Sequence, residues 1–201
     1  MKTSLFVHEM SHAVHALLSQ DILGTIRSTE DGGAIYSGNT HEEWSKDFTA
    51  HNAIAGLAGG FFIEVHTILN GKQSPEQLLE TFITNKSIPT KVRYGLSSVH
   101  ASASDLEAIK GYDLDEFANT APLGWTIGMI LLRNPEYLNE VSESISETNH
   151  LLLDRTDAEA LLRGEMPPVR IGNASVYLAS GQVMHPAQAV LLNELIKGAT
   201  A

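Results

Sequence analysis

Residues 8 to 12 read His-Glu-Met-Ser-His, a spacing that can build a metal site with its own general base. On a helix His8 and His12 are four positions apart, so both imidazoles leave one face and can share a metal ion. Glu9 lies beside that face, where it can take a proton from water without ligating the metal. So short a pattern also arises by chance on an exposed amphipathic helix, and the rest of the chain must support the catalytic interpretation.

The composition limits which residues can bind a metal, and the start of the sequence bears on the cellular location. The chain has no cysteine, so its metal ligands must be His, Asp or Glu, and a disulfide framework is excluded. Two histidines and a carboxylate would leave a position open for water, which is typical of catalytic Zn²⁺. We therefore expect one Zn²⁺ per chain. Because so few residues precede the motif, we expect no signal peptide and a cytoplasmic protein.

Size, charge and hydropathy exclude other classes. With 201 residues, 43% of them hydrophobic, the chain can bury a full core. The net charge of −11, without a basic stripe, argues against nucleic acid as a partner. No run of 18 apolar residues occurs, so we expect no membrane segment.

The first part of the chain predicts a helix, a β-hairpin and a long second helix. The motif helix should extend to about residue 18, and β-branched residues in 22–27 and 34–36 flank an Asp-Gly-Gly turn. An edge strand beside the motif helix could bind an extended peptide, or it could be a purely structural cover. The second helix should run from about 42 to 69, and its small residues at 53–60 would let the motif helix approach closely.

The remainder predicts mostly short helices. Residues 74–77 form a capping box, and Ser102 is expected to cap a helix that has Asp105 in its first turn. Apolar spacing predicts helices at 127–132 and 134–145, and Thr156 is expected to open a further capping box. The expected fold class is therefore mainly α (α+β), with a small sheet beside the motif helix.

After Pro167 and Pro168 the pattern changes to an expected hairpin, 169–178, and a last helix, 186–197. We expect two units, residues 1–166 and an appendage of residues 167–201. The last helix has an apolar stripe, which packs on its own domain or joins subunits of a homo-oligomer.

Three segments of the chain follow one another as HEMSHA at 8–13, GGFFIE at 59–64 and HASASDLEA at 100–108. In order and spacing they resemble the peptidase domain of the FtsH-type AAA+ zinc proteases. That family has HEAGHA on its first helix, Gly-Gly-x-x-x-Glu on the next, and Ser/Thr-x-x-x-Asn-Asp-Leu later. The similarity covers about residues 4–165 and implies a helical zincin-type HExxH metallopeptidase domain.

The resemblance implies that Asp105 is the third zinc ligand, with His8 and His12, and that Glu9 is the catalytic base. Glu64 is then expected to orient a ligating histidine, and it is also the alternative third ligand. Lone residues of these types are usually a surface charge or a helix-start aspartate. The implied activity is zinc-dependent endopeptidase cleavage of unfolded or loosely folded polypeptides.

Several positions depart from the family pattern. Met10 and Ser11 replace Ala-Gly, and Ser104 stands where the family has Asn. No G-x-x-x-x-G-K-[ST] occurs, so unfolding a substrate would need a separate unfoldase or adaptor. The chain could instead be a catalytically silent binding or regulatory protein. His15, His66 and His100 are candidates for holding an oxyanion, although structural roles are commoner for lone histidines.

Overall fold

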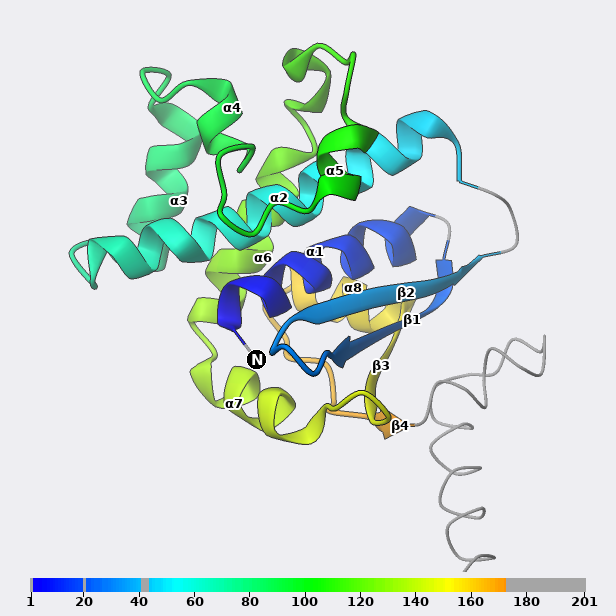
Figure 1. Cartoon of the computed structure of the whole chain (residues 1–201). Coiled ribbons are helices and arrows are strands. Elements are labelled where there is room, and N and C mark those ends of the chain that lie inside the picture. The colour runs from blue at the N-terminus through cyan, green and yellow to red at the C-terminus, as the bar shows by residue number, and fades with distance from the viewer. Residues whose placement is uncertain (1, 20, 41–43, 173–201) are drawn as a thin grey trace, which may run out of the picture.

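The structure is a computed structural model that describes residues 2–19, 21–40 and 44–172. It is mainly helical with one small antiparallel sheet, as the sequence predicts (Figure 1). The strands are β1 (Asp21–Ser28), β2 (Ala34–Thr40), β3 (His150–Asp154) and β4 (Ile171–Gly172). The helices are α1 (Thr3–Ser19), α2 (Lys46–Leu69), α3 (Pro75–Thr84), α4 (Thr90–Arg93), α5 (Ala103–Ala108), η1 (Leu114–Phe117), α6 (Ala121–Leu132), α7 (Pro135–Ser144) and α8 (Arg155–Leu162).

Helix α1 lies at the centre of the fold, between the sheet and α2 (Figure 1). It contacts β1 and β2 on one side and α2, α6 and α8 on others, so it is buried over most of its length. The fully buried side chains of Phe6, Met10 and Leu17 anchor it in the core. The motif therefore lies on a packed core helix, and the exposed amphipathic helix is not what the structure has.

The sheet has the order β2-β1-β3-β4, and each neighbouring pair is antiparallel. The predicted hairpin is present as β1 and β2, with Gly32 at a φ of 80° in its turn. Among the described strands β2 is at one edge of the sheet, and it contacts α1.

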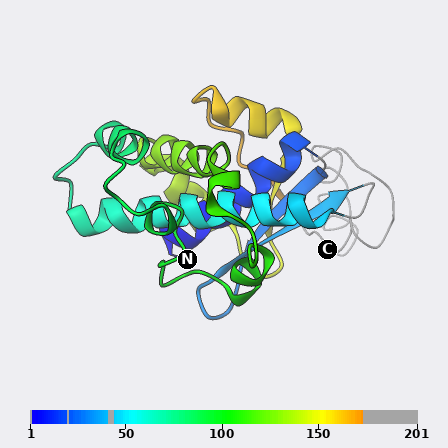
Figure 2. The ribbon, with the colours of Figure 1, turned by 90° about the horizontal axis from the view of Figure 1, so that it is seen from above.

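Small residues on α2 allow the close approach to α1 that the sequence predicts. A Cβ added to Gly60 would lie 3.1 Å from the Cβ of His8, and one added to Gly56 would overlap the ring of His12. A Cβ added to Gly59 would overlap the hydroxyl of Ser11. Seen from above, α2 runs across the described part of the molecule (Figure 2). The glycines of α2 thus let the two helices lie close together at the turn of α1 that carries both histidines.

Helix α2 starts later than the expected residue 42. Ser45 is its N-cap and accepts a hydrogen bond from the backbone N–H of Phe48, so the helix begins at Lys46. Its end is as predicted, because Asn70 and Gly71 take positive φ values of 49° and 74°.

The expected cap at Thr156 is wrong. Asp154 is the N-cap of α8 and forms a reciprocal capping box with Asp157, so the box begins two residues earlier. The predicted helices at 127–132 and 134–145 correspond to α6 and α7, although α6 already begins at Ala121.

The first residues of the expected appendage pair with the main sheet. Strand β4 pairs with β3, and Leu152 donates a backbone hydrogen bond to the carbonyl oxygen of Arg170 over 2.8 Å. The remainder of the expected hairpin and the helix at 186–197 lie outside the described residues. The division at residue 166 and the apolar stripe of the last helix stay predictions.

Among the described helices, α2 is long and apolar enough to cross a membrane by length and composition. The same helix packs against α1 and α6, and 61% of its apolar stretch is buried. The expectation of no membrane segment therefore stays a prediction.

Candidate metal centre

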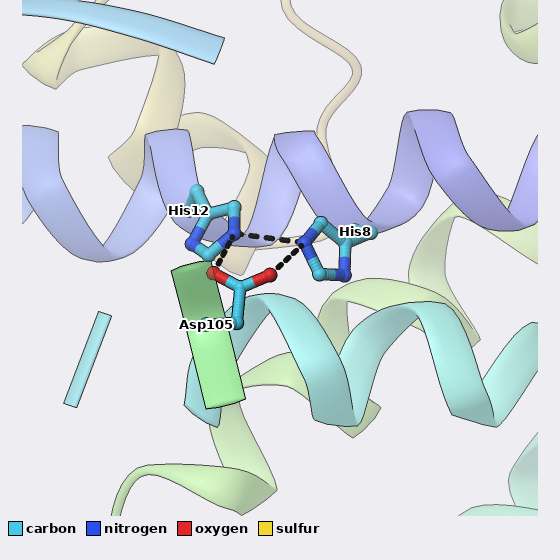
Figure 3. Close-up of side chains that lie close together, drawn as sticks. All are labelled: His8, His12 and Asp105. Carbon is cyan, nitrogen blue, oxygen red and sulfur yellow. Dashed lines mark hydrogen bonds and ion pairs between the residues drawn. The ribbon is translucent and has the colours of Figure 1, made fainter. Parts of the chain in front are cut away.

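Three side chains from two distant parts of the chain bring their donor atoms together (Figure 3). Nε2 of His8 and Nε2 of His12 are 2.9 Å apart, both on α1. Asp105, from α5, places Oδ2 3.2 Å from Nε2 of His8 and Oδ1 3.5 Å from Nε2 of His12. Within the described chain, this is the group of His and carboxylate side chains whose donor atoms lie close enough to hold a metal ion.

The separations fit a small tetrahedral cation. Ligand atoms about 2.0–2.1 Å from Zn²⁺ at tetrahedral angles lie roughly 3.3 Å from one another. The separations of 2.9, 3.2 and 3.5 Å in this group span that value. Two neutral imidazoles and one carboxylate are also the donor types that catalytic zinc sites use.

The ring of His12 is held in the orientation and tautomer that a metal ligand needs. Its Nδ1 donates to the backbone carbonyl oxygen of Asn52 over 2.9 Å, which leaves Nε2 with a lone pair aimed into the group. Burial, followed by the repulsion that His8 would exert on a protonated His12 ring, lowers the pKa of His12, so the neutral form of His12 is favoured. The helix pair α1 and α2 therefore prepares this nitrogen for a cation.

Asp105 is fixed by the residue that caps its helix. Ser102 accepts from the backbone N–H of Asp105 and donates its own hydroxyl hydrogen to Oδ2 over 2.6 Å. Burial opposes ionisation of the carboxyl, but its hydrogen bond with His8 and its electrostatic interactions with His12 and His8 outweigh this effect. The pKa of Asp105 is lowered to about 2, so the group is a carboxylate.

Glu9 borders the group without joining it. Its Oε1 lies 4.0 Å from Nε2 of His8, while its Oε2 accepts a hydrogen bond from the backbone N–H of Tyr36 over 2.7 Å. Burial raises the pKa of Glu9, although His12 and the Tyr36 N–H act in the opposite direction. A raised pKa makes the carboxylate a stronger base toward water.

These residues line a cleft of about 620 Å³. One wall is strand β2, through Ala34, Ile35, Tyr36 and Gly38, and the other walls come from α1, α2 and α5. Trp44 also lines the cleft, and the lining is mostly apolar. A cleft of this size admits a peptide segment or a small molecule.

Glu64 lies apart from the donor group. On α2 it follows Gly60 by one turn, at the end of the helix pair where α1 begins, and it lines a separate cavity with Ser4. There it accepts a hydrogen bond from Ser98 and lies 3.8 Å from Nε2 of His100. The described contacts thus tie Glu64 to the loop before α5. They include no contact from it to a histidine of the motif.

The three histidines considered for an oxyanion do not line the cleft. His15 stacks on Phe48 and accepts a hydrogen bond from Asn52, and burial lowers its pKa to about 4. His100 lies beside Glu64, and His66 is two residues after Glu64 on α2. The structure therefore brings together His8, His12, Asp105 and Glu9, but not these three.

Sequence reasoning missed Asn52 and the backbone of Tyr36. A signal for Asn52 was present, because it lies four residues before Gly56 and so on the face of α2 that meets α1. Tyr36 carries no such signal, because its contribution is a backbone N–H whose partner is 27 residues away.

Comparison of the chain with models of protein families, with curated proteins and with solved structures gave no match. We therefore infer the function from the geometry of the site.

Proposed function

We propose that this protein is a zinc-dependent endopeptidase of the FtsH-like kind that cleaves unfolded or loosely folded polypeptides. The observation that carries the proposal is the convergence of His8, His12 and Asp105 on one point, with the Glu9 carboxylate beside it in an open cleft. A purely structural metal site would need neither a neighbouring base nor an open cleft.

His8, His12 and Asp105 would hold the metal, and their donor types and separations fit Zn²⁺. Zn²⁺ held there would supply a Lewis acid that polarises a carbonyl group and acidifies water. The backbone carbonyl of Asn52 and the hydroxyl of Ser102 keep two of the ligands oriented.

Glu9 would move the protons of the reaction. As water adds to the carbonyl carbon of the scissile bond, a carboxylate oxygen of Glu9 accepts the proton that the water loses. When the C–N bond breaks, the same carboxyl delivers the proton to the departing amine nitrogen, and the base is regenerated. Burial, which raises the pKa of Glu9, suits both halves of this cycle.

Strand β2 would receive the polypeptide. Ladder hydrogen bonds alternate between the two edges of an antiparallel strand, and Gly33 already bonds toward β1 through its carbonyl oxygen. The backbone groups of Ala34, Tyr36 and Gly38 therefore face the cleft, which all three residues line. An extended segment can pair with this edge. Because the pairing is made through backbone hydrogen bonds, it requires a substrate whose backbone is exposed, that is, an unfolded one.

The decisive experiment is cleavage of casein and of a mixed peptide library by the purified protein reconstituted with Zn²⁺. We expect internal peptide bonds to be cut, and we expect a chelator to stop the reaction and added zinc to restore it. Zinc binding without cleavage, alone and with candidate unfoldases, would replace this proposal with the catalytically silent binding protein. Cleavage that a chelator does not affect would remove zinc chemistry from the account.

A further inference from the structure

We infer that the backbone N–H of Tyr36 positions the carboxylate of Glu9, so that one strand both orients the base and receives the substrate. The inference rests on the proposed peptidase function for its catalytic consequence. The contact itself is a property of the fold, and it can be tested without any activity.

The two oxygens of Glu9 have different neighbours. Oε2 accepts the hydrogen bond from Tyr36 over 2.7 Å, and Oε1 lies 4.0 Å from Nε2 of His8. A glutamate side chain has several rotatable bonds, and a hydrogen bond to a charged oxygen removes much of that freedom. The N–H of Tyr36 therefore holds one oxygen back and leaves the other directed toward the donor group.

Tyr36 is itself held firmly. It stands opposite Ile26 of β1, one residue along from the pair formed by Arg27 and Ile35. Its ring lies over Gly24, where a Cβ would come within 2.8 Å of a ring carbon and within 3.4 Å of Leu17. The absence of a side chain at Gly24 lets the ring pack there, so the amide that reaches Glu9 belongs to a well-packed residue.

The contact also bears on how a polypeptide pairs with β2. The N–H groups of Ala34, Tyr36 and Gly38 face the cleft, and Glu9 occupies the middle one. A substrate strand can then form backbone hydrogen bonds with Ala34 and Gly38, but opposite Tyr36 it meets the Glu9 carboxylate. We expect this interruption to set the register, with the scissile bond opposite Tyr36.

Proline substitution separates the N–H from the side chain. Proline has no N–H and is tolerated on an edge strand where that group points away from the sheet. Tyr36→Pro and Tyr36→Ala lose the same ring, but only Tyr36→Pro also loses the donor. We expect kcat of Tyr36→Pro to fall about 10- to 100-fold below that of Tyr36→Ala, with little further change in KM.

Ala34→Pro is the matched control. It removes a cleft-facing N–H two residues away, at the first position of β2, and this N–H does not bond Glu9. We expect Ala34→Pro to raise KM far more than it lowers kcat, which is the opposite pattern. Equal kcat values for Tyr36→Pro and Tyr36→Ala, both folded, would overturn the inference.

An NMR measurement tests the contact whether or not the protein cleaves peptides. In the parent, the Tyr36 amide proton should resonate downfield and exchange slowly, and in Glu9→Ala it should lose both properties. The amide of Ser37, which faces β1, serves as the control and should stay unchanged. A Tyr36 amide that Glu9→Ala leaves unaffected would overturn the inference. Failure of the parent to cleave any peptide would overturn the proposed function alone.

Discussion

His12 and Asn52 are joined by two hydrogen bonds that run in opposite directions between α1 and α2. Nδ1 of His12 donates to the backbone carbonyl oxygen of Asn52 over 2.9 Å, and Nδ2 of Asn52 donates to the backbone carbonyl oxygen of His12 over 2.9 Å. Both residues are buried, so each bond is made away from competing water. The orientation of one candidate ligand is thus built into the packing of the two central helices.

Asn52→Ala should remove one of these two hydrogen bonds and keep the other. The variant loses the side-chain donor but keeps the backbone carbonyl, so the ring of His12 should keep its tautomer. We expect the free energy of unfolding to fall by about 1–3 kcal/mol, because Nδ2 of Asn52 no longer donates to His12 and His15. We expect the zinc dissociation constant to change less than tenfold. Denaturant unfolding and a competitive zinc titration measure the two effects, and a large loss of zinc affinity at unchanged stability would contradict this account.

Much of the scaffold could be predicted because its signals are local. The hairpin has Gly32 where a positive φ is needed, and Ser74 and Ser102 cap helices through bonds within three residues. Asp105 was placed in a first turn by the same local rule. Only the family resemblance predicts that Asp105 lies close to the two histidines of α1.

The interactions that complete the site could not be predicted in this way. The bonds of Asn52 to His12 and of Tyr36 to Glu9 join residues 40 and 27 positions apart. The glycines of α2 indicate which face Asn52 shares, but not that its partner is His12, and no local pattern indicates the bond from Tyr36. Local competition explains the error at α8. Asp154 and Thr156 are both good N-cap types, and the end of β3 at Asp154 decides between them.

The ligand assignment predicts about one Zn²⁺ per chain and a distinct pattern of loss. His8→Ala and His12→Ala should abolish binding. Asp105→Ala should weaken it by more than the roughly 10- to 100-fold that is typical of an outer-shell partner. Glu64→Ala should retain zinc, because the Glu64 carboxylate contacts Ser98 and His100 instead. Metal analysis after dialysis checks the set. Zinc that survives Asp105→Ala but not Glu64→Ala would reverse the assignment.

Ser102 should matter to the metal as well as to its helix. Its hydroxyl caps α5 and donates to the Asp105 carboxylate, so Ser102→Ala removes a cap and an outer-shell bond together. We expect zinc affinity to fall about 10- to 100-fold and stability to fall by roughly 1 kcal/mol. Ser104→Ala is the control, because Ser104 is exposed and bonds only the Ser102 hydroxyl among the described contacts. Equal zinc affinities of the two variants would argue against this role.

Glu9→Gln should separate binding from catalysis. The amide is nearly the same size and its oxygen can still accept from Tyr36, so the fold and the zinc content should be kept. The amide cannot take a proton from water, and we expect peptide cleavage to fall by about 10²–10⁴-fold. Circular dichroism, zinc analysis and cleavage assays on the same preparation test this. A variant that cuts peptides at the parental rate would show that Glu9 is not the base.

A pH dependence of stability should originate outside the cleft, at Asp157. Burial raises the pKa of this carboxyl to about 6, although the Asp154 N–H and Arg170 beside it act in the opposite direction. The folded state therefore holds this proton more tightly than the unfolded chain does. The stability that this adds is fully present below about pH 3.8 and is lost as the pH rises through about 6.

Asp157→Asn removes this titration. The difference in unfolding free energy between the parent and Asp157→Asn should move in favour of the parent as the pH falls from 7 to 5. Denaturant unfolding at several pH values, together with an NMR titration of the Asp157 carboxyl carbon, measures both sides of the linkage. A difference that is the same at pH 5 and pH 7 would mean that Arg170 keeps Asp157 ionised throughout this range.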